Sequence, residues 1–166
     1  SGCPGEPLHG DQLRQGAARR SGIRTILLPE AYDSHTSVRY PVIYDQGHFS
    51  LRAPGSFGTG CAFDKFWLAP STPRMIYVTL QHPSPYYDDS YGVNSENNGP
   101  FGDAILQELV PAVESKFRAI REPWARILTG GSTGGWIAAA HQVFYPDFYG
   151  GTFALCPDSV DFTYHQ

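Results

Sequence analysis

The 166-residue chain has few cysteines, few basic residues and no long apolar run. Its three cysteines are an odd number without the spacing of zinc ligands, so neither a disulfide framework nor a metal site is indicated. The 12 Lys and Arg against 16 Asp and Glu leave a net charge of -4, which predicts no nucleic-acid or membrane partner. The sequence also lacks a membrane-spanning stretch and the apolar core of an export signal, and it leaves the cellular location open.

What the chain does contain is enough apolar residues, 41% of the total, to bury one core. Residues 1–22 hold Pro, Gly and Arg with few large apolar groups, which predicts an extended amino-terminal arm. Residues 23–166 are then expected to form a single minimal domain. No cofactor is indicated.

Short apolar runs alternate with helical patterns in this domain. Runs bounded by Pro, Gly, Asp or Ser predict strands at residues 23–28, 40–44, 75–80, 125–129 and 152–156. Residues 103–117 predict a helix with Asp103 as its N-cap and a kink at Pro111, and a second helix is expected at 136–144. The alternation predicts an α/β fold whose mainly parallel sheet is flanked by helices and binds ligands at the carboxyl ends of its strands.

The run GGSTGG at residues 130–135 places a G-x-S-x-G pattern between a predicted strand and a predicted helix. This context is typical of a nucleophile elbow, a tight turn that presents its serine at the edge of the sheet. Gly130 and Gly134 would leave room for the strand and helix to approach closely. The alternative is a phosphate-binding turn at a helix N-terminus, but no Lys follows as in a P-loop. Ser132 is therefore the candidate nucleophile.

Four segments, in this order along the chain, resemble the esterase branch of the α/β-hydrolases, which includes esterase D-like, feruloyl esterase and enterochelin esterase-like enzymes. They are YPVIY and QGHF within 40–49, QHP and YYDDSY within 81–91, NGPFGDA at 98–104 and GGSTGGW at 130–136. The resemblance extends from residue 23 to about residue 162. It implies an α/β-hydrolase fold and a serine hydrolase that cleaves carboxylic esters.

The same resemblance implies roles for particular residues. Ser132 matches the nucleophile, and the backbone N–H of Thr133 matches one donor of the oxyanion hole. The second donor is expected at His48 or Phe49, in the loop after the strand at 40–44. Because the family's acid and histidine lie far downstream of the serine, whereas this chain ends at Gln166, we expect a fold truncated after its sixth strand.

Two residues near the carboxyl terminus could complete a catalytic triad. Asp158 follows the strand at 152–156 and is the candidate acid, with Asp161 as a weaker one. His165 is the candidate base, because Ser132, Asp158 and His165 keep the order of nucleophile, acid and base that the fold uses.

Other histidines and two tyrosines supply further candidates. His48 and His82 follow predicted strands and are alternative bases, whereas His141 on the helix after the serine is expected to be structural. A substrate-binding role is predicted for His82, Tyr86 and Tyr87.

The sequence thus favours a serine esterase that forms an acyl-enzyme on Ser132 and acts on small or polymeric esters, including aryl, feruloyl-type or polyester substrates. We expect slow turnover, because the acid and base are displaced or missing. A non-catalytic binding module and an acyltransferase that uses the same serine remain alternatives. The strand at 152–156 carries no charge and no Pro, so its exposed edge predicts a homo-oligomer.

Overall fold

The computed structural model of the chain describes residues 13–14, 22–47, 57–58, 60, 62–82, 84 and 89–161. Its strands are β1 (Leu13–Arg14), β2 (Ile23–Leu27), β3 (Val42–Gln46), β4 (Ile76–Leu80), β5 (Asn94–Ser95), β6 (Gly99–Pro100), β7 (Arg126–Gly131) and β8 (Gly151–Leu155). The helical segments are α1 (Ala62–Leu68), α2 (Phe101–Ala104), the π-helical η2 (Ile105–Leu109), α3 (Val110–Lys116), the 3-10 turn η3 (Pro123–Ala125) and α4 (Thr133–Phe144).

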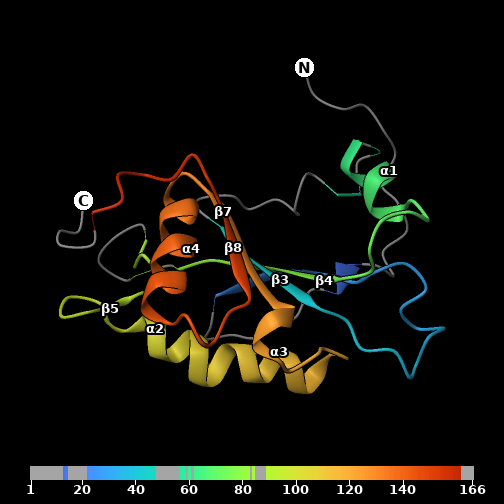
Figure 1. Ribbon diagram of the computed structural model, residues 1–166, viewed down its shortest axis with the longest axis horizontal. Coiled ribbons are helices and arrows are strands. Elements are labelled where there is room, and N and C mark those ends of the chain that lie inside the picture. Colours follow the sequence, from blue (N-terminus) through green and yellow to red (C-terminus); the bar gives the residue numbers. More distant parts are fainter. Residues whose placement is uncertain are drawn as a thin grey trace.

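The main sheet has the strand order β1-β2-β4-β3-β7-β8. Strands β4, β3, β7 and β8 are parallel, whereas β2 is antiparallel to β4 and β1 to β2. The predicted α/β fold and its five predicted strands are confirmed, with small shifts at the strand ends. Because β3, β7 and β8 run in one direction, their carboxyl ends meet at the same edge of the sheet (Figure 1).

Two strands occupy the edges of the sheet. Strand β8 ends the strand order, as the sequence predicted for residues 152–156. At the other end, Leu13 and Arg14 of the predicted arm pair with β2 and so belong to the sheet. The division into an arm of residues 1–22 and a domain of residues 23–166 stays a prediction.

One face of the sheet carries the main core. Alternating residues such as Val42, Tyr44 and Leu128 are fully buried there, in one cluster with Leu109 and Val113 of the helical run. Figure 1 shows α2 and α3 along the lower side of the sheet, and α4 packs on β3, β7 and β8. The period-two burial along the strands explains why hydrophobic runs predicted them well.

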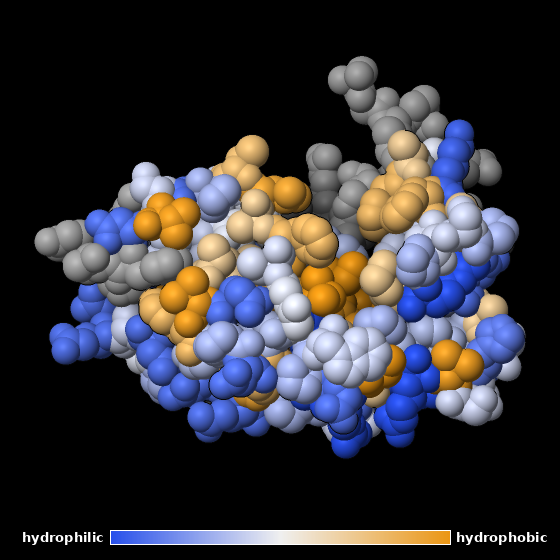
Figure 2. All heavy atoms as spheres, in the orientation of Figure 1, coloured by the Kyte–Doolittle hydropathy of each residue, from blue (hydrophilic) through white to orange (hydrophobic). Residues whose placement is uncertain are grey.

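The opposite face is covered over β2 and β4, where Trp67 of α1 packs against Leu27 and Tyr77. Over β8 the same face is open to solvent, since Phe153 and Leu155 are 67% and 59% exposed. Figure 2 shows hydrophobic side chains near the centre of the view, around the position of β8 in Figure 1. This exposed strand is where self-association was predicted from the sequence, and that assembly stays a prediction.

The helix predicted at 103–117 is observed as one continuous helical run through α2, η2 and α3. The prediction of Asp103 as N-cap is wrong, because the run begins at Phe101 with Pro100 before it. The side chain of Asn94 instead accepts a hydrogen bond from the Asp103 backbone N–H at 3.0 Å. Directly before α3, whose first turn holds Pro111, the helix widens into the π-helical segment η2. The kink expected at Pro111 stays a prediction.

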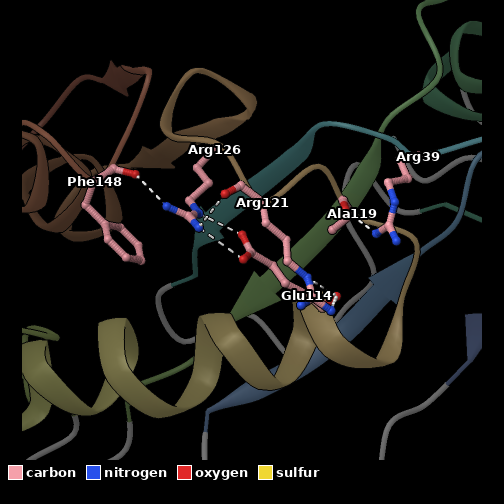
Figure 3. A network of polar contacts seen from close by, with 6 residues as sticks. All are labelled: Arg39, Glu114, Ala119, Arg121, Arg126 and Phe148. Atoms are coloured by element: carbon pink, nitrogen blue, oxygen red, sulfur yellow. Dashed lines mark hydrogen bonds and ion pairs between the residues drawn. The ribbon is translucent and has the colours of Figure 1, made fainter.

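A buried ion pair joins α3 to the start of β7 (Figure 3). Arg126 donates from Nε to Glu114 Oε1 at 2.7 Å and from Nη2 to Oε2 at 3.1 Å. The guanidinium also donates to the carbonyl oxygens of Phe148 and Arg121, both at 3.3 Å. Only 3% of Glu114 is exposed, and its hydrogen bonds raise the pKa of Arg126. The charges of Glu114 and Arg126 are therefore held together by a bidentate ion pair.

Loss of the Glu114 charge should destabilise the fold strongly. Glu114→Gln leaves the Arg126 charge half-buried without its counter-ion, and we expect it to lower the free energy of unfolding by about 3 kcal/mol. The same substitution at Glu30, whose ion pair with Arg74 lies at the surface, should cost less than about 1 kcal/mol. Urea unfolding of both variants measures the difference, and equal losses would contradict the assignment.

Candidate active site

Ser132 lies on a sharp turn between β7 and α4, with φ 55° and ψ −125°. A side chain other than glycine at such a φ is strained, and strain of this kind is commonly held in place at functional sites. Two hydrogen bonds fix the turn: Ser132 N–H donates to the carbonyl oxygen of Leu155 at 3.0 Å, and Trp136 N–H donates to that of Ser132 at 3.0 Å. The serine side chain is thereby presented to solvent at the carboxyl end of the sheet.

The glycines on either side of Ser132 are required by close backbone packing. A Cβ added at Gly134 would overlap the backbone oxygen of Gln46 and lie 3.0 Å from its carbonyl carbon. At Gly130 it would overlap the carbonyl group of Gly134. The predicted reason for both glycines, close approach of strand and helix, agrees with this geometry, which also brings in Gln46 at the end of β3.

Asp158 contacts both the serine and the residue after it. Ser132 Oγ donates to Asp158 Oδ1 at 3.2 Å, and Thr133 Oγ1 donates to Oδ2 at 2.8 Å. The Thr133 amide lies in the first turn of α4, where backbone N–H groups have no partner within the helix. Ser132, Thr133 and Asp158 are therefore together, whereas Asp161 is exposed, and its backbone N–H donates to the carbonyl oxygen of Ser159.

His82 lies in the interior, with 4% of its surface exposed. Its Nε2 forms a 2.7 Å hydrogen bond with Oε1 of Gln46, and its carbonyl oxygen accepts a hydrogen bond from Ser90 N–H at 2.7 Å. Burial, with a smaller effect of His141, lowers the pKa of His82 to about 3. The ring is therefore neutral and turned toward a structural partner, an environment that does not favour its predicted contact with substrate.

His141 is also buried and neutral. Its Nε2 hydrogen-bonds the carbonyl oxygen of Gly92 at 2.7 Å, and Nδ1 lies 3.2 Å from the Tyr149 hydroxyl. Burial lowers its pKa to about 4. Nearby, the rings of Tyr91 and Trp136 meet edge to face with centroids 5.4 Å apart. These contacts fix the segment around Gly92 on α4, in agreement with the structural role predicted for His141.

Gln46 is the residue of this region that the sequence analysis missed. Its backbone lies against Gly134 and its side chain bonds His82, while its buried Nε2 has no hydrogen-bond partner. The available signal was its position at the end of a predicted strand, directly before Gly47. Several predicted site residues lie outside the described part of the chain: His48, Phe49, Tyr86, Tyr87 and His165.

The described residues contain no group of three or more His, Cys, Asp or Glu side chains arranged to hold a metal ion. Within the same residues, every helix is too short or too polar to cross a membrane.

The close contact at Gly134 predicts a large effect of a single methyl group. Gly134→Ala should destabilise the fold by about 3 kcal/mol or more, because its Cβ meets rigid backbone of Gln46. Gly131→Ala is the matched control, since the nearest atom to its added Cβ is 3.9 Å away. Thermal unfolding of both variants measures the difference. Comparable stability of the two alanine variants would contradict the packing described.

A third titratable group affects the pH dependence of stability. Asp45 of β3 is half-buried, and its burial, opposed by a hydrogen bond from Tyr77, raises its pKa to about 6. When unfolded, the carboxyl group has a pKa near 3.8. Between these values the folded chain holds a proton that the unfolded chain releases, so lowering the pH stabilises the fold through Asp45.

The two buried imidazoles have the opposite effect. Unfolded histidines bind protons below about pH 6.5, whereas His82 and His141 stay neutral until about pH 3 and 4. Asp45 cancels the effect of one imidazole, so unfolding should take up about one net proton between pH 6 and 4. The free energy of unfolding should therefore fall by about 1.4 kcal/mol for each unit by which the pH is lowered in this range. Asp45→Asn should double this slope in urea titrations. A slope that the substitution leaves unchanged would refute the assignment.

The fold of this chain is similar to those of several solved structures. A ferulic acid esterase matches with a TM-score of 0.66 and 21% identity, over 80% of this chain and 52% of that one. An S-formylglutathione hydrolase from Agrobacterium tumefaciens matches with a TM-score of 0.60 and 14% identity, over 87% and 56%. Enterochelin esterase from Shigella flexneri matches with a TM-score of 0.59 and 16% identity, over 90% and 37%. The chain thus spans about half or less of the length of these structures.

A search of curated proteins gives no match. The family profile described as "Putative esterase", in contrast, matches residues 20–159, which include the whole sheet from β2 onward and the turn at Ser132. The chain belongs to this esterase family and has its α/β-hydrolase fold.

Proposed function

We propose that this protein is a serine hydrolase that cleaves carboxylic esters through an acyl-enzyme on Ser132. The observation that carries the proposal is the strained turn at the carboxyl end of β7, which exposes the Ser132 side chain directly before the first turn of α4. This is the geometry expected of a nucleophile elbow. Membership of the esterase family supports the reaction class.

In the proposed first step, Ser132 Oγ attacks the ester carbonyl and the carbonyl oxygen becomes an oxyanion. The Thr133 amide, at the positive end of the α4 dipole, would donate to this oxygen. A second donor is proposed at His48 or Phe49. The alcohol then leaves, and water releases the acid from the acyl-enzyme in a second attack.

The proton-transfer groups are also proposals. Asp158 is the candidate acid, and His165 is the candidate base in the order expected from the fold. The direct hydrogen bond from Ser132 to Asp158 is unlike a triad, in which the histidine separates nucleophile and acid. Slow turnover therefore remains our expectation for this chain, and activated aryl esters are the preferred test substrates. A feruloyl or polyester substrate and acyl transfer to an alcohol are narrower hypotheses.

Ser132→Ala should abolish both turnover of p-nitrophenyl acetate and labelling by a fluorophosphonate probe. We expect a loss of at least about 10³-fold in kcat/KM, because the covalent intermediate cannot form. Thermal stability should change little, since alanine adopts the same strained backbone about as readily as serine. Intact-protein mass spectrometry locates the label.

Ser115→Ala provides the control, because Ser115 is exposed on α3 and its hydroxyl donates to the local carbonyl of Ala112. It should hydrolyse and label like the parent chain. Activity that survives in Ser132→Ala would refute the nucleophile assignment. A parent chain that neither labels nor turns over would favour the binding-module alternative.

A further inference from the structure

The charge beside the candidate nucleophile indicates which esters the site would accept. Asp158 holds its carboxylate on Ser132 Oγ and Thr133 Oγ1, so a negative charge lies within one hydrogen bond of the attacking atom. Both of these partners are neutral hydroxyl groups. They satisfy the carboxylate oxygens without cancelling the charge.

The arginine contacts of the described residues lie at the other end of the sheet. Figure 3 shows Arg126, at the start of β7, paired with Glu114, and Arg39 bonded to the carbonyl of Ala119. Arg74, just before β4, likewise pairs with Glu30. The parallel strands therefore run from a basic, charge-paired end to an end where a carboxylate faces the reacting serine.

This arrangement affects the transition state. A carboxylate close to the developing oxyanion opposes it electrostatically, and a positive charge on the substrate would offset that repulsion. An anionic substituent would add to it. At a separation of about 5 Å in a partly solvated site, one unit charge changes a rate by roughly tenfold.

We propose that Asp158 makes this site selective for esters that carry a cationic group near the scissile carbonyl, and that it disfavours anionic ones. This inference rests on the proposed function of Ser132. It assigns Asp158 a role in specificity that is separate from its candidacy as catalytic acid, because selectivity is a ratio between substrates on one enzyme.

The test compares esters of equal shape and different charge. On the acyl side, p-nitrophenyl esters of 4-(trimethylammonio)butanoate, 5,5-dimethylhexanoate and glutarate are cationic, neutral and anionic. On the alcohol side, acetylcholine is compared with 3,3-dimethylbutyl acetate. In at least one series, kcat/KM should favour the cation over its neutral partner by about tenfold, and the glutarate ester should be the poorest acyl substrate. Added salt should reduce the preference.

Asp158→Asn removes the charge while keeping polar atoms near both hydroxyl groups, and it should bring the cation-to-neutral ratio close to one. Asp161→Asn is the matched control, since it removes one charge from the exposed part of the same segment and should leave the ratio nearly unchanged.

The outcomes separate the two proposals. A ratio near one in both series of the parent chain, with Ser132 still labelled and active, overturns the selectivity and leaves the esterase intact. A tenfold ratio that survives in Asp158→Asn also overturns it. Absence of both labelling and turnover overturns the esterase and, with it, the selectivity.

Discussion

The structure depends on one backbone contact, between the end of β3 and the first turn of α4. The carbonyl of Gln46 lies so close to Gly134 that no side chain fits between them, and Gly130 is equally crowded by the Gly134 backbone. This contact sets how near α4 comes to the sheet. That distance leaves the chain a strained turn between β7 and α4, and the turn exposes Ser132 and directs its hydroxyl toward Asp158. If Gln46 and Gly134 lay farther apart, this packing would no longer force the strained turn that exposes Ser132 and directs its hydroxyl toward Asp158.

Buried neutral side chains hold the segments next to the contact of Gln46 with Gly134. His82 bonds the Gln46 side chain, and His141 bonds the carbonyl of Gly92, where an added Cβ would lie 3.2 Å from the His82 ring. Buried imidazoles serve here because each one bonds without carrying a charge. The charged pair of Glu114 and Arg126 lies instead at the amino ends of the strands. The sheet thus separates structural charge at one end from the candidate chemistry at the other.

Much of this arrangement was predictable from residues alone. The strands, the helix after Ser132 and the reason for Gly130 and Gly134 follow from local pattern and steric demand, which act over a few neighbouring residues. The contacts between distant segments were harder. The bond between Gln46 and His82 joins positions 36 residues apart, and no periodicity encodes such a pairing.

Contacts from other segments also explain why the predicted N-cap at Asp103 was wrong and why the exact contacts of Asp158 were not predicted. Asp103 has the residue type of an N-cap, but Asn94, from the loop before, occupies the hydrogen-bonding position. Asp158 was predicted near the site because it follows the strand beside β7. Its direct contact with Ser132 and Thr133, without an intervening histidine, depends on how far β8 extends and could not be predicted from composition or spacing.

The π-helical segment η2 has a consequence for how this chain tolerates insertion and deletion. Its wider turn lets the consecutive residues Leu109 and Val110 both face the core, at 5% and 1% exposure. Because the wider turn absorbs one residue, removing a residue from η2 would restore an ordinary α-helix and leave the residues beyond it facing nearly the same way. Glu114 would keep its place opposite Arg126. A deletion between Val110 and Glu114 has no such turn to absorb it and would rotate Glu114 by about 100°, so chain length is tolerated at η2 and constrained in α3.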